Sequence, residues 1–214
     1  MWEEVFDNKI PNIDYSFNNY FPNLYYINLD KRSDRRQHMQ KTLSNINLSA
    51  NRFPAVPSDS RGYEARLACK ESHKNLIETA IKNNFNNICI LEDDCLFIDN
   101  FHELFEKNIR FLPINWDILY IGHCFGSGSE YRIGENLYST SGTYCTHAYC
   151  LNKKAYSIII KKLNSSNNAI DHIYKNLCYH KIIKGYIIDP GLVHQIPNLS
   201  DIGEGPNSSK NLIL

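Results

Sequence analysis

Short apolar runs alternate with amphipathic segments along most of the chain. Residues 24–29 are rich in β-formers and predict a strand, and the uniformly apolar 88–91 predicts a strand buried on both faces. Apolar residues spaced three or four apart predict helices. Further strands are expected at 51–56, 116–121, 144–151 and 185–188, and helices from Ser33 onward and at 67–83, 101–109 and 153–163. This alternation predicts an α/β fold with a mainly parallel central sheet flanked by helices.

The two ends of the chain lack this pattern. We expect an N-terminal extension at 1–20, a single domain at 21–202 and a loose C-terminal tail at 203–214, where glycine, proline and serine gather. The Gly- and Ser-rich stretch 122–131 lacks the Gly-Lys-Ser/Thr ending of a phosphate-binding P-loop. It is interpreted as a mobile loop over a ligand site.

Charge and hydropathy restrict the partners. Lys plus Arg and Asp plus Glu number 23 each, so no net field favours nucleic acid, and no nucleic-acid partner is expected. The acidic first residues do not resemble a secretory signal, and no run of eighteen apolar residues could span a membrane. These features predict a cytoplasmic protein without a membrane span, and they leave the oligomeric state open.

The seven cysteines, at 69, 89, 95, 124, 145, 150 and 178, are odd in number and lie mostly among apolar neighbours. With no export signal, they are interpreted as buried thiols in a reducing compartment. No two of them have C-x-x-C spacing, so a structural zinc site is not expected.

Three consecutive carboxylates, Glu92, Asp93 and Asp94, directly follow the most apolar predicted strand. Ligands of open α/β sheets bind beyond the carboxyl ends of strands. If the strand continued, Glu92 and Asp94 would point to one side and Asp93 to the other. Like charges ~4 Å apart repel by ~4 kcal/mol at an effective dielectric constant near 20, and the apolar neighbours offer no compensation. A hard divalent cation, Mn²⁺ or Mg²⁺, would relieve this repulsion and could stabilise a departing diphosphate. The alternative is a solvated acidic turn.

Several segments in order along the chain carry a family resemblance. They are LYYINLDKRSDRR (24–36), FPAV (53–56), LACKESH (67–73), ILEDD (90–94), WDILYIG (116–122), THAY (146–149), ID (170–171) and Gln195 with SDI (200–202). Together they resemble the motifs of family-25 glycosyltransferases, the group that contains lipooligosaccharide and procollagen galactosyltransferases.

The resemblance implies a nucleotide-diphospho-sugar transferase fold of the GT-A type, dependent on Mn²⁺ or Mg²⁺. It further implies transfer of a hexose, galactose or glucose, from a UDP-sugar to a hydroxyl of a glycan or hydroxylysine acceptor, with inversion at the anomeric carbon. Carried onto this chain, Asp94 becomes the metal ligand, while Glu92 and Asp93 contact the uridine or ribose.

The donor site is expected to draw on residues next to the first strand. Asn28, Leu29, Arg32 and Arg35 lie where a nucleotide would approach, and guanidinium groups suit phosphate. The alternative for the arginines is a solvated basic start of a helix. By the family match, the donor-binding set also includes Ala55 and His73, although a lone histidine on an amphipathic helix is often structural.

The acceptor side is expected to hold the catalytic base, Asp171, a carboxylate that could take the proton of the acceptor hydroxyl. Its alternative role is a helix cap. His147 and Gln195 are assigned to the acceptor side, His147 with a core histidine as the alternative. His194 is a candidate metal ligand, because enzymes of this fold often place a late histidine on the metal, although the family match falls on Gln195 instead.

Two other functions remain open. A nucleotidyltransferase also needs acidic residues and a metal beside a nucleotide, but it releases pyrophosphate. A catalytically inactive sugar-binding module is the non-enzymatic alternative, against which the intact carboxylates at 92–94 and 171 argue.

Overall fold

Eight strands form the central sheet of the computed structural model, which describes residues 14–124, 128–197 and 201. The order across the sheet is β2-β1-β3-β8-β5-β9-β7-β6. The strands are β1 (Leu24–Asn28), β2 (Asn51–Pro54), β3 (Asn87–Glu92), β5 (Ile118–Gly122), β6 (Ser129–Arg132), β7 (Leu137–Thr140), β8 (Ala148–Asn152) and β9 (Gly185–Ile188). A separate antiparallel pair joins β4 (Cys95–Phe97) to β10 (Val193–Gln195).

The strand directions make the sheet mixed. β1 pairs in parallel with β2 and β3, and β5 pairs in parallel with β9. β8 lies between β3 and β5 and is antiparallel to both, so β3 and β5 run in the same direction. β7 is antiparallel to both β9 and β6. The predicted α/β class is confirmed, with β7 and β8 running against the other strands of the main sheet.

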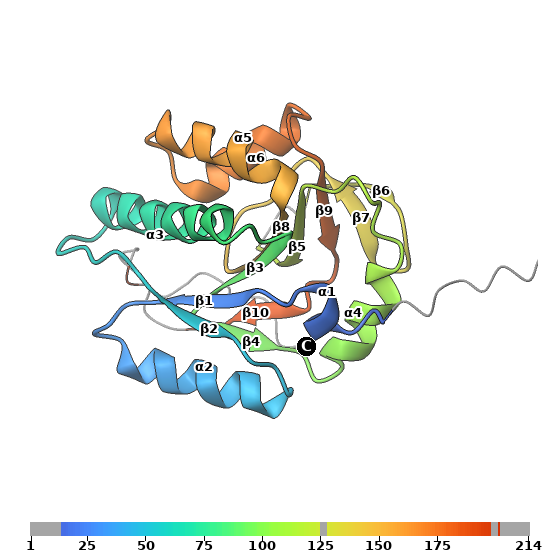
Figure 1. The fold of residues 1–214 in the computed structure, drawn as a ribbon, viewed down its shortest axis with the longest axis horizontal. Helices are drawn as coiled ribbons and strands as arrows, with labels where there is room; N and C mark the ends of the chain where they lie inside the picture. The colour runs from blue at the N-terminus through green and yellow to red at the C-terminus, as the bar shows by residue number, and fades with distance from the viewer. Residues whose placement is uncertain (1–13, 125–127, 198–200, 202–214) are drawn as a thin grey trace, which may run out of the picture.

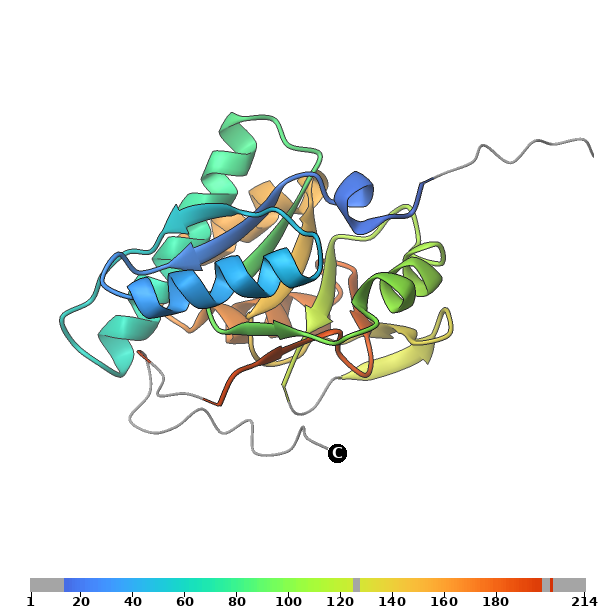
Figure 2. The same ribbon diagram turned by 90° about the horizontal axis from the view of Figure 1, so that it is seen from below.

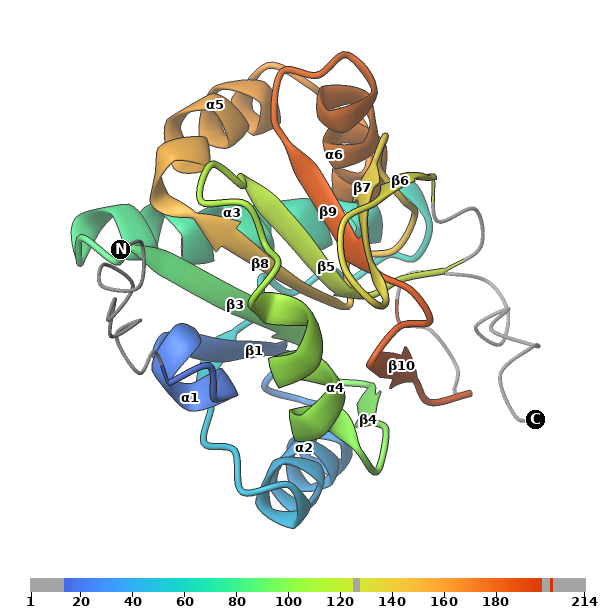
Figure 3. The same ribbon diagram turned by 90° about the vertical axis from the view of Figure 1, so that its right-hand side faces the viewer.

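Helices cover both faces of the sheet (Figures 1 and 3). On one face lie α3 (Tyr63–Lys82), α5 (Lys153–Asn164) and α6 (Ile170–Tyr179). The other face carries α1 (Phe17–Tyr20), α2 (Ser33–Asn45), α4 (Phe101–Ile109) and the β4–β10 pair. Figure 2, seen from the second face, shows α2 lying across β1.

The sheet residues alternate between two hydrophobic cores. On β3, Ile88 and Ile90 belong to the core under α3, α5 and α6, whereas Cys89 and Leu91 belong to the core on the α2 and α4 side. All four side chains are fully buried. Burial of a side chain of this kind stabilises the fold by about 1.5–3 kcal/mol. The prediction that this strand is buried on both faces is confirmed.

Part of the segment expected to be an N-terminal extension packs against the domain. Phe17 is fully buried, and its ring centroid lies 5.1 Å from that of Phe101. Residues 1–13 and the predicted tail at 203–214 lie outside the described residues. The predicted loop at 122–131 is only partly a loop, because Gly122 ends β5 and Ser129 begins β6; its residues 125–127 lie outside the described part. Within the described ranges, no helix is both long enough and apolar enough to cross a membrane.

Candidate functional site

A pocket of about 130 Å³ opens at the carboxyl ends of β1, β2 and β3, against the first half of α3. Three neighbouring parallel strands end here, which is where open α/β sheets bind ligands. The structure brings eight of the predicted site residues into the lining: Leu29, Arg35, Ala55, His73, Glu92, Asp93, Asp94 and Gln195. Six of the eight predicted donor residues therefore share one cavity, although they are spread over 64 positions of sequence, from 29 to 93.

The acidic segment turns away from strand geometry after Glu92, where β3 ends. The side-chain alternation expected for 92–94 therefore does not continue. Both aspartates face the same guanidinium group, with Arg35 Nη1 2.8 Å from Asp93 Oδ1 and 3.7 Å from Asp94 Oδ2. Arg35 is itself buried. The compensation that the apolar neighbours in sequence do not offer comes from a cation 58 positions away, which reaches Asp93.

Asp93 is held by two donors. Its Oδ2 accepts a hydrogen bond of 2.7 Å from Asn28 Nδ2, and its Oδ1 accepts the bond from Arg35. Burial raises the pKa of Asp93, and the bonds from Arg35 and Asn28 oppose this rise. These contacts fix the Asp93 carboxylate in place at the floor of the pocket.

Asp94 is buried and lies beside Arg35 and Gln195. Only 3% of its surface is exposed, and both of its carboxylate oxygens lie 3.3 Å from Gln195 Nε2. Burial, followed by the negative charge of Glu92, raises the pKa of Asp94 to about 7. The β4–β10 pairing positions Gln195 here, and the Ile196 amide also donates to the Asp94 carbonyl oxygen. A positive charge bound beside Asp94 would lower this pKa.

Glu92 sits on the opposite wall, beside α3. Its Oε1 accepts a hydrogen bond of 3.1 Å from Thr146 Oγ1 and lies 3.6 Å from His73 Nε2. Burial acts to raise the pKa of Glu92, but His73 and Thr146 outweigh it, so the pKa lies below its usual value. Glu92 is therefore the carboxylate of the three that stays ionised most readily.

Asn28 and Arg32 act outside the pocket lining. Asn28 is buried, and its Oδ1 accepts a hydrogen bond of 2.9 Å from Arg52 Nε. Arg32 donates two hydrogen bonds to Asp34 and forms an ion pair with Asp201, which lines the pocket. Both residues contact side chains that line the pocket, Asn28 through Asp93 and Arg32 through Asp201. Arg32 would therefore act on a ligand in the pocket only through Asp201. Ser200 and Ile202, which flank Asp201 in the family motif, lie outside the described residues.

Asp171 and His194 do not line the pocket. Asp171 is the second residue of α6, where its Oδ1 accepts from the His172 amide at 2.8 Å and its Oδ2 lies 3.5 Å from the Cys145 amide. The helix-cap alternative does not hold, because Ala169 is the N-cap of α6 and Asp171 lies within the first turn. His194 lies on β10 opposite Leu96, and burial lowers its pKa.

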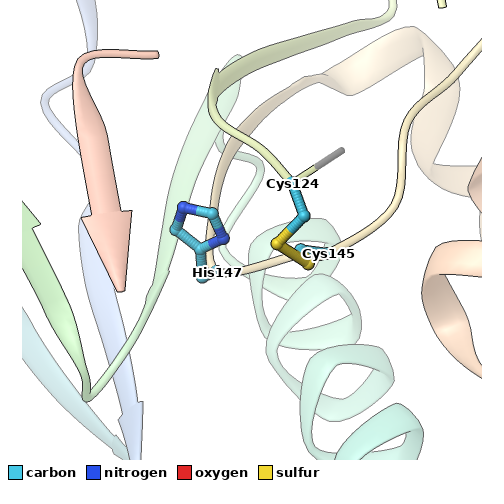
Figure 4. Close-up of side chains that lie close together, drawn as sticks. All are labelled: Cys124, Cys145 and His147. Atoms are coloured by element: carbon cyan, nitrogen blue, oxygen red, sulfur yellow. A yellow bond between two sulfur atoms is a disulfide. The ribbon is translucent and has the colours of Figure 1, made fainter. Parts of the chain in front are cut away.

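His147 is a core residue beside a disulfide (Figure 4). It is buried, and its Nε2 lies 3.0 Å from the carbonyl oxygen of Val193. Gly122 permits this contact, because a Cβ there would lie 2.4 Å from His147 Nε2. Burial lowers the pKa of His147. The core interpretation fits these contacts better than a position facing an acceptor.

The cysteine prediction is wrong for two of the seven residues. Cys124 and Cys145 form a disulfide, with Cα atoms 5.7 Å apart, although 21 positions separate them in sequence. The chain after β5 and the chain before β8 run side by side, and this brings the two sulfurs together (Figure 4). Because both sulfurs are used in the bond, they and His147 do not form a metal site. The other five cysteines are free, as predicted.

Sequence reasoning missed several pocket residues. Lys31 is exposed and lines the pocket beside the end of β1, where its charge could meet phosphate. Ser72 Oγ accepts from the Val56 amide and donates to the Ala68 carbonyl, each at 2.8 Å, which ties the segment after β2 to α3. Cys69 lines the pocket one helical turn before His73. Their position in the family-like segments 24–36 and 67–73 was the available signal.

Comparisons with known proteins point to one family. A family model described as Glycosyltransferase family 25 (LPS biosynthesis protein) matches residues 64–195. Procollagen galactosyltransferase 1 of Danio rerio is 26% identical over 129 residues, which cover 48% of this chain and 21% of that protein. Inactive glycosyltransferase 25 family member 3 of Mus musculus is 23% identical over 129 residues, covering 48% and 22%. The chain spans about a fifth of the length of these curated relatives.

A solved structure supports the fold. A glycosyltransferase involved in the glycosylation of the major capsid of PBCV-1 superposes with a TM-score of 0.52 at 11% identity. The superposition covers 83% of this chain and 93% of that chain. The likeness confirms the predicted glycosyltransferase type of α/β fold.

Proposed function

Because the chain belongs to glycosyltransferase family 25, we propose that it moves a hexose from a UDP-sugar to an acceptor hydroxyl. The proposed hexose is galactose or glucose, and the proposed acceptor is a glycan or a hydroxylysine. The single observation that carries this proposal is the acidic turn Glu92-Asp93-Asp94, which lies in a pocket at the carboxyl edge of the sheet beside basic side chains.

Different residues of the pocket lining are proposed to contact the base, the ribose and the diphosphate of the donor. Leu29 and Ala55 offer backbone and apolar surface at the ends of β1 and β2 for the base. Glu92 and Asp93 are the proposed contacts of the uridine and ribose, with Asn28 and Arg35 holding Asp93 in position. Lys31 is the cation in the lining that extends toward solvent, and we assign it to the diphosphate.

The residues around Asp94 fit a hard divalent cation, Mn²⁺ or Mg²⁺. The fit rests on the chemistry of the donor set, because the buried Asp94 carboxylate lines the pocket beside the side-chain amide of Gln195. Gln195 can supply a second oxygen, because its amide oxygen and nitrogen exchange places when the amide turns over. When bound, such a cation supplies charge neutralisation for the departing diphosphate. Arg35 contributes a fixed positive charge at the same turn.

We keep Asp171 as the proposed general base of an inverting displacement. It is partly buried near the pocket, where its negative charge acts on the Cys69 thiol of the lining. An acceptor hydroxyl would have to approach from the α6 side to reach it. Asp201, which lines the pocket, is the second candidate.

A panel of UDP-sugars tests the function. Purified protein is incubated with Mn²⁺ and each UDP-sugar, and released UDP is measured. We expect slow hydrolysis of UDP-galactose or UDP-glucose that stops in the Asp94→Asn variant. Release of pyrophosphate from a nucleoside triphosphate and a sugar phosphate would instead identify a nucleotidyltransferase.

A second candidate is a catalytically inactive family member. It is favoured by the matches to relatives named as inactive or probably inactive in Mus musculus and Rattus norvegicus. Binding of UDP-sugar without hydrolysis or transfer, with Asp94→Asn reducing binding alone, would establish this alternative.

A further inference from the structure

Three different metal-binding atoms converge on the α3 wall of the pocket. The Cys69 sulfur, a His73 ring nitrogen and a Glu92 carboxylate oxygen all lie within 4.8 Å of one another. Cys69 and His73 are four positions apart on α3, so both point to the same side of the helix. Glu92 reaches them from the end of β3. All three residues line the pocket.

The His73 ring is oriented as a metal-binding imidazole would be. Its Nδ1 lies 2.8 Å from Tyr149 Oη, which in turn lies 3.3 Å from Tyr174 Oη. Its Nε2 is buried without a hydrogen-bond partner, and the nearest carboxylate oxygen, on Glu92, is 3.6 Å away. His73 itself is fully buried. A hydrogen bond from Nδ1 to Tyr149 would leave the Nε2 lone pair free to face Cys69 and Glu92.

The donor set selects the kind of metal. Sulfur, imidazole nitrogen and carboxylate oxygen are the ligands of Zn²⁺, whereas Mn²⁺ and Mg²⁺ prefer oxygen alone. Three protein ligands with a fourth position open to a cavity is the arrangement of an accessible zinc site. We propose that Cys69, His73 and Glu92 form a Zn²⁺ site in the pocket wall, separate from the oxygen-ligand site at Asp94.

Occupation of this site has two consequences. Cys69 binds as the thiolate and releases its proton to solvent. Glu92 is also the proposed nucleoside contact, so Zn²⁺ would compete with a UDP-sugar for this carboxylate. The proposal itself does not depend on the transferase function, because the site is defined by its three ligands.

Co²⁺ is the probe for the test, because a thiolate ligand gives bound Co²⁺ a charge-transfer band in the near ultraviolet. The full chain is titrated with Co²⁺ without reductant, which keeps the Cys124–Cys145 disulfide closed. We expect one Co²⁺ per chain with this band, and its displacement by Zn²⁺. Cys69→Ser should abolish the band, whereas Cys178→Ala, which removes a buried thiol on α6, should leave it unchanged.

Two further variants separate this site from its neighbours. Tyr149→Phe keeps the ring but removes the partner of His73 Nδ1, and should weaken Co²⁺ binding ~10–100-fold. Asp94→Asn should leave the band intact even where it abolishes Mn²⁺ binding. The proposal is overturned if the folded protein gives no charge-transfer band, if the band survives in Cys69→Ser, or if Asp94→Asn removes it. Melting curves of each variant confirm that the comparison is between folded proteins.

Discussion

Arg35 shows how much of the site is set by single residues that are distant in sequence. One guanidinium group contacts Asp93 directly and lies within 4.0 Å of Asp94 and Asp201. The acidic motif after a buried strand predicted where the pocket would be. It could not predict the partners of the carboxylates, because Arg35, Asn28 and Gln195 reach them only through the packing of α2, β1 and β10.

The pH dependence of the unfolding free energy should show whether Asp94 is protonated in the folded chain. Its pKa is about 7 in the folded chain and near 3.8 when exposed. The folded state therefore holds a proton that the unfolded state has lost between pH 4 and pH 7, and stability falls as the pH rises through this window. Relative to Asp94→Asn, the metal-free wild type should lose roughly 1.4 kcal/mol of unfolding free energy per pH unit. Urea unfolding at several pH values measures this.

If the unfolding free energies of wild type and Asp94→Asn differ by the same amount at every pH from 4 to 7, Asp94 is already ionised in the folded state. The exposed Asp99, replaced by asparagine, is the matched control. It should leave the pH profile of the wild type unchanged.

The assignment of Asp171 as base leads to a kinetic prediction. Asp171→Asn keeps the shape of the side chain and its acceptor oxygen at the start of α6, but removes its basicity. We expect UDP-sugar affinity to be retained and transfer to fall by roughly 10²–10⁴-fold, the usual contribution of a general base. The measurements are calorimetric binding of the donor and the transfer rate to an acceptor. An unchanged rate would move the role to Asp201, for which Asp201→Asn is the parallel variant.

At the scale of elements, most strands and helices were predicted, and the strands that were missed are short ones without a clear pattern. The helix at 101–109 and the strand at 185–188 match α4 and β9. β4, β6, β7 and β10 have three or four residues each, too few to show a period of two. The strand expected from 144 begins at Ala148, because the disulfide at Cys145 holds the preceding chain beside the end of β5.

The disulfide also acts at the scale of elements, because it closes a loop of 21 positions that contains the β6–β7 hairpin. Loop closure of about this length stabilises a fold by about 3 kcal/mol. Reductant should therefore lower the unfolding free energy of the wild type by ~2–4 kcal/mol in urea titrations. The double variant Cys124→Ser, Cys145→Ser should not respond to reductant. Seven reactive thiols in the denatured, unreduced protein, instead of five, would contradict the pairing.

At the scale of the whole molecule, the order of strands and helices sufficed for the fold class but not for strand direction. β8 has the same apolar character as β3 and β5, and only the antiparallel register between them reveals its direction. The aromatic cluster of Phe17, Phe101 and Phe105 likewise joins α1 to α4 across more than eighty positions. Such pairings depend on tertiary packing, which local sequence patterns do not encode.

Binding of the two proposed ligands, Mn²⁺ and UDP, should be thermodynamically coupled. Mn²⁺ at Asp94 and the diphosphate of UDP attract each other, so each should bind more tightly when the other is present. At a hundredfold excess over the dissociation constant, a ligand adds about 2.7 kcal/mol of stability, or ~5–10 °C in Tm for a chain of this size. We expect the Tm shift with Mn²⁺ and UDP together to exceed the sum of the separate shifts. In Asp94→Asn the joint shift should fall to that of UDP alone, whereas Asp99→Asn should behave as the wild type. A joint shift that survives in Asp94→Asn would place the Mn²⁺ elsewhere in the pocket.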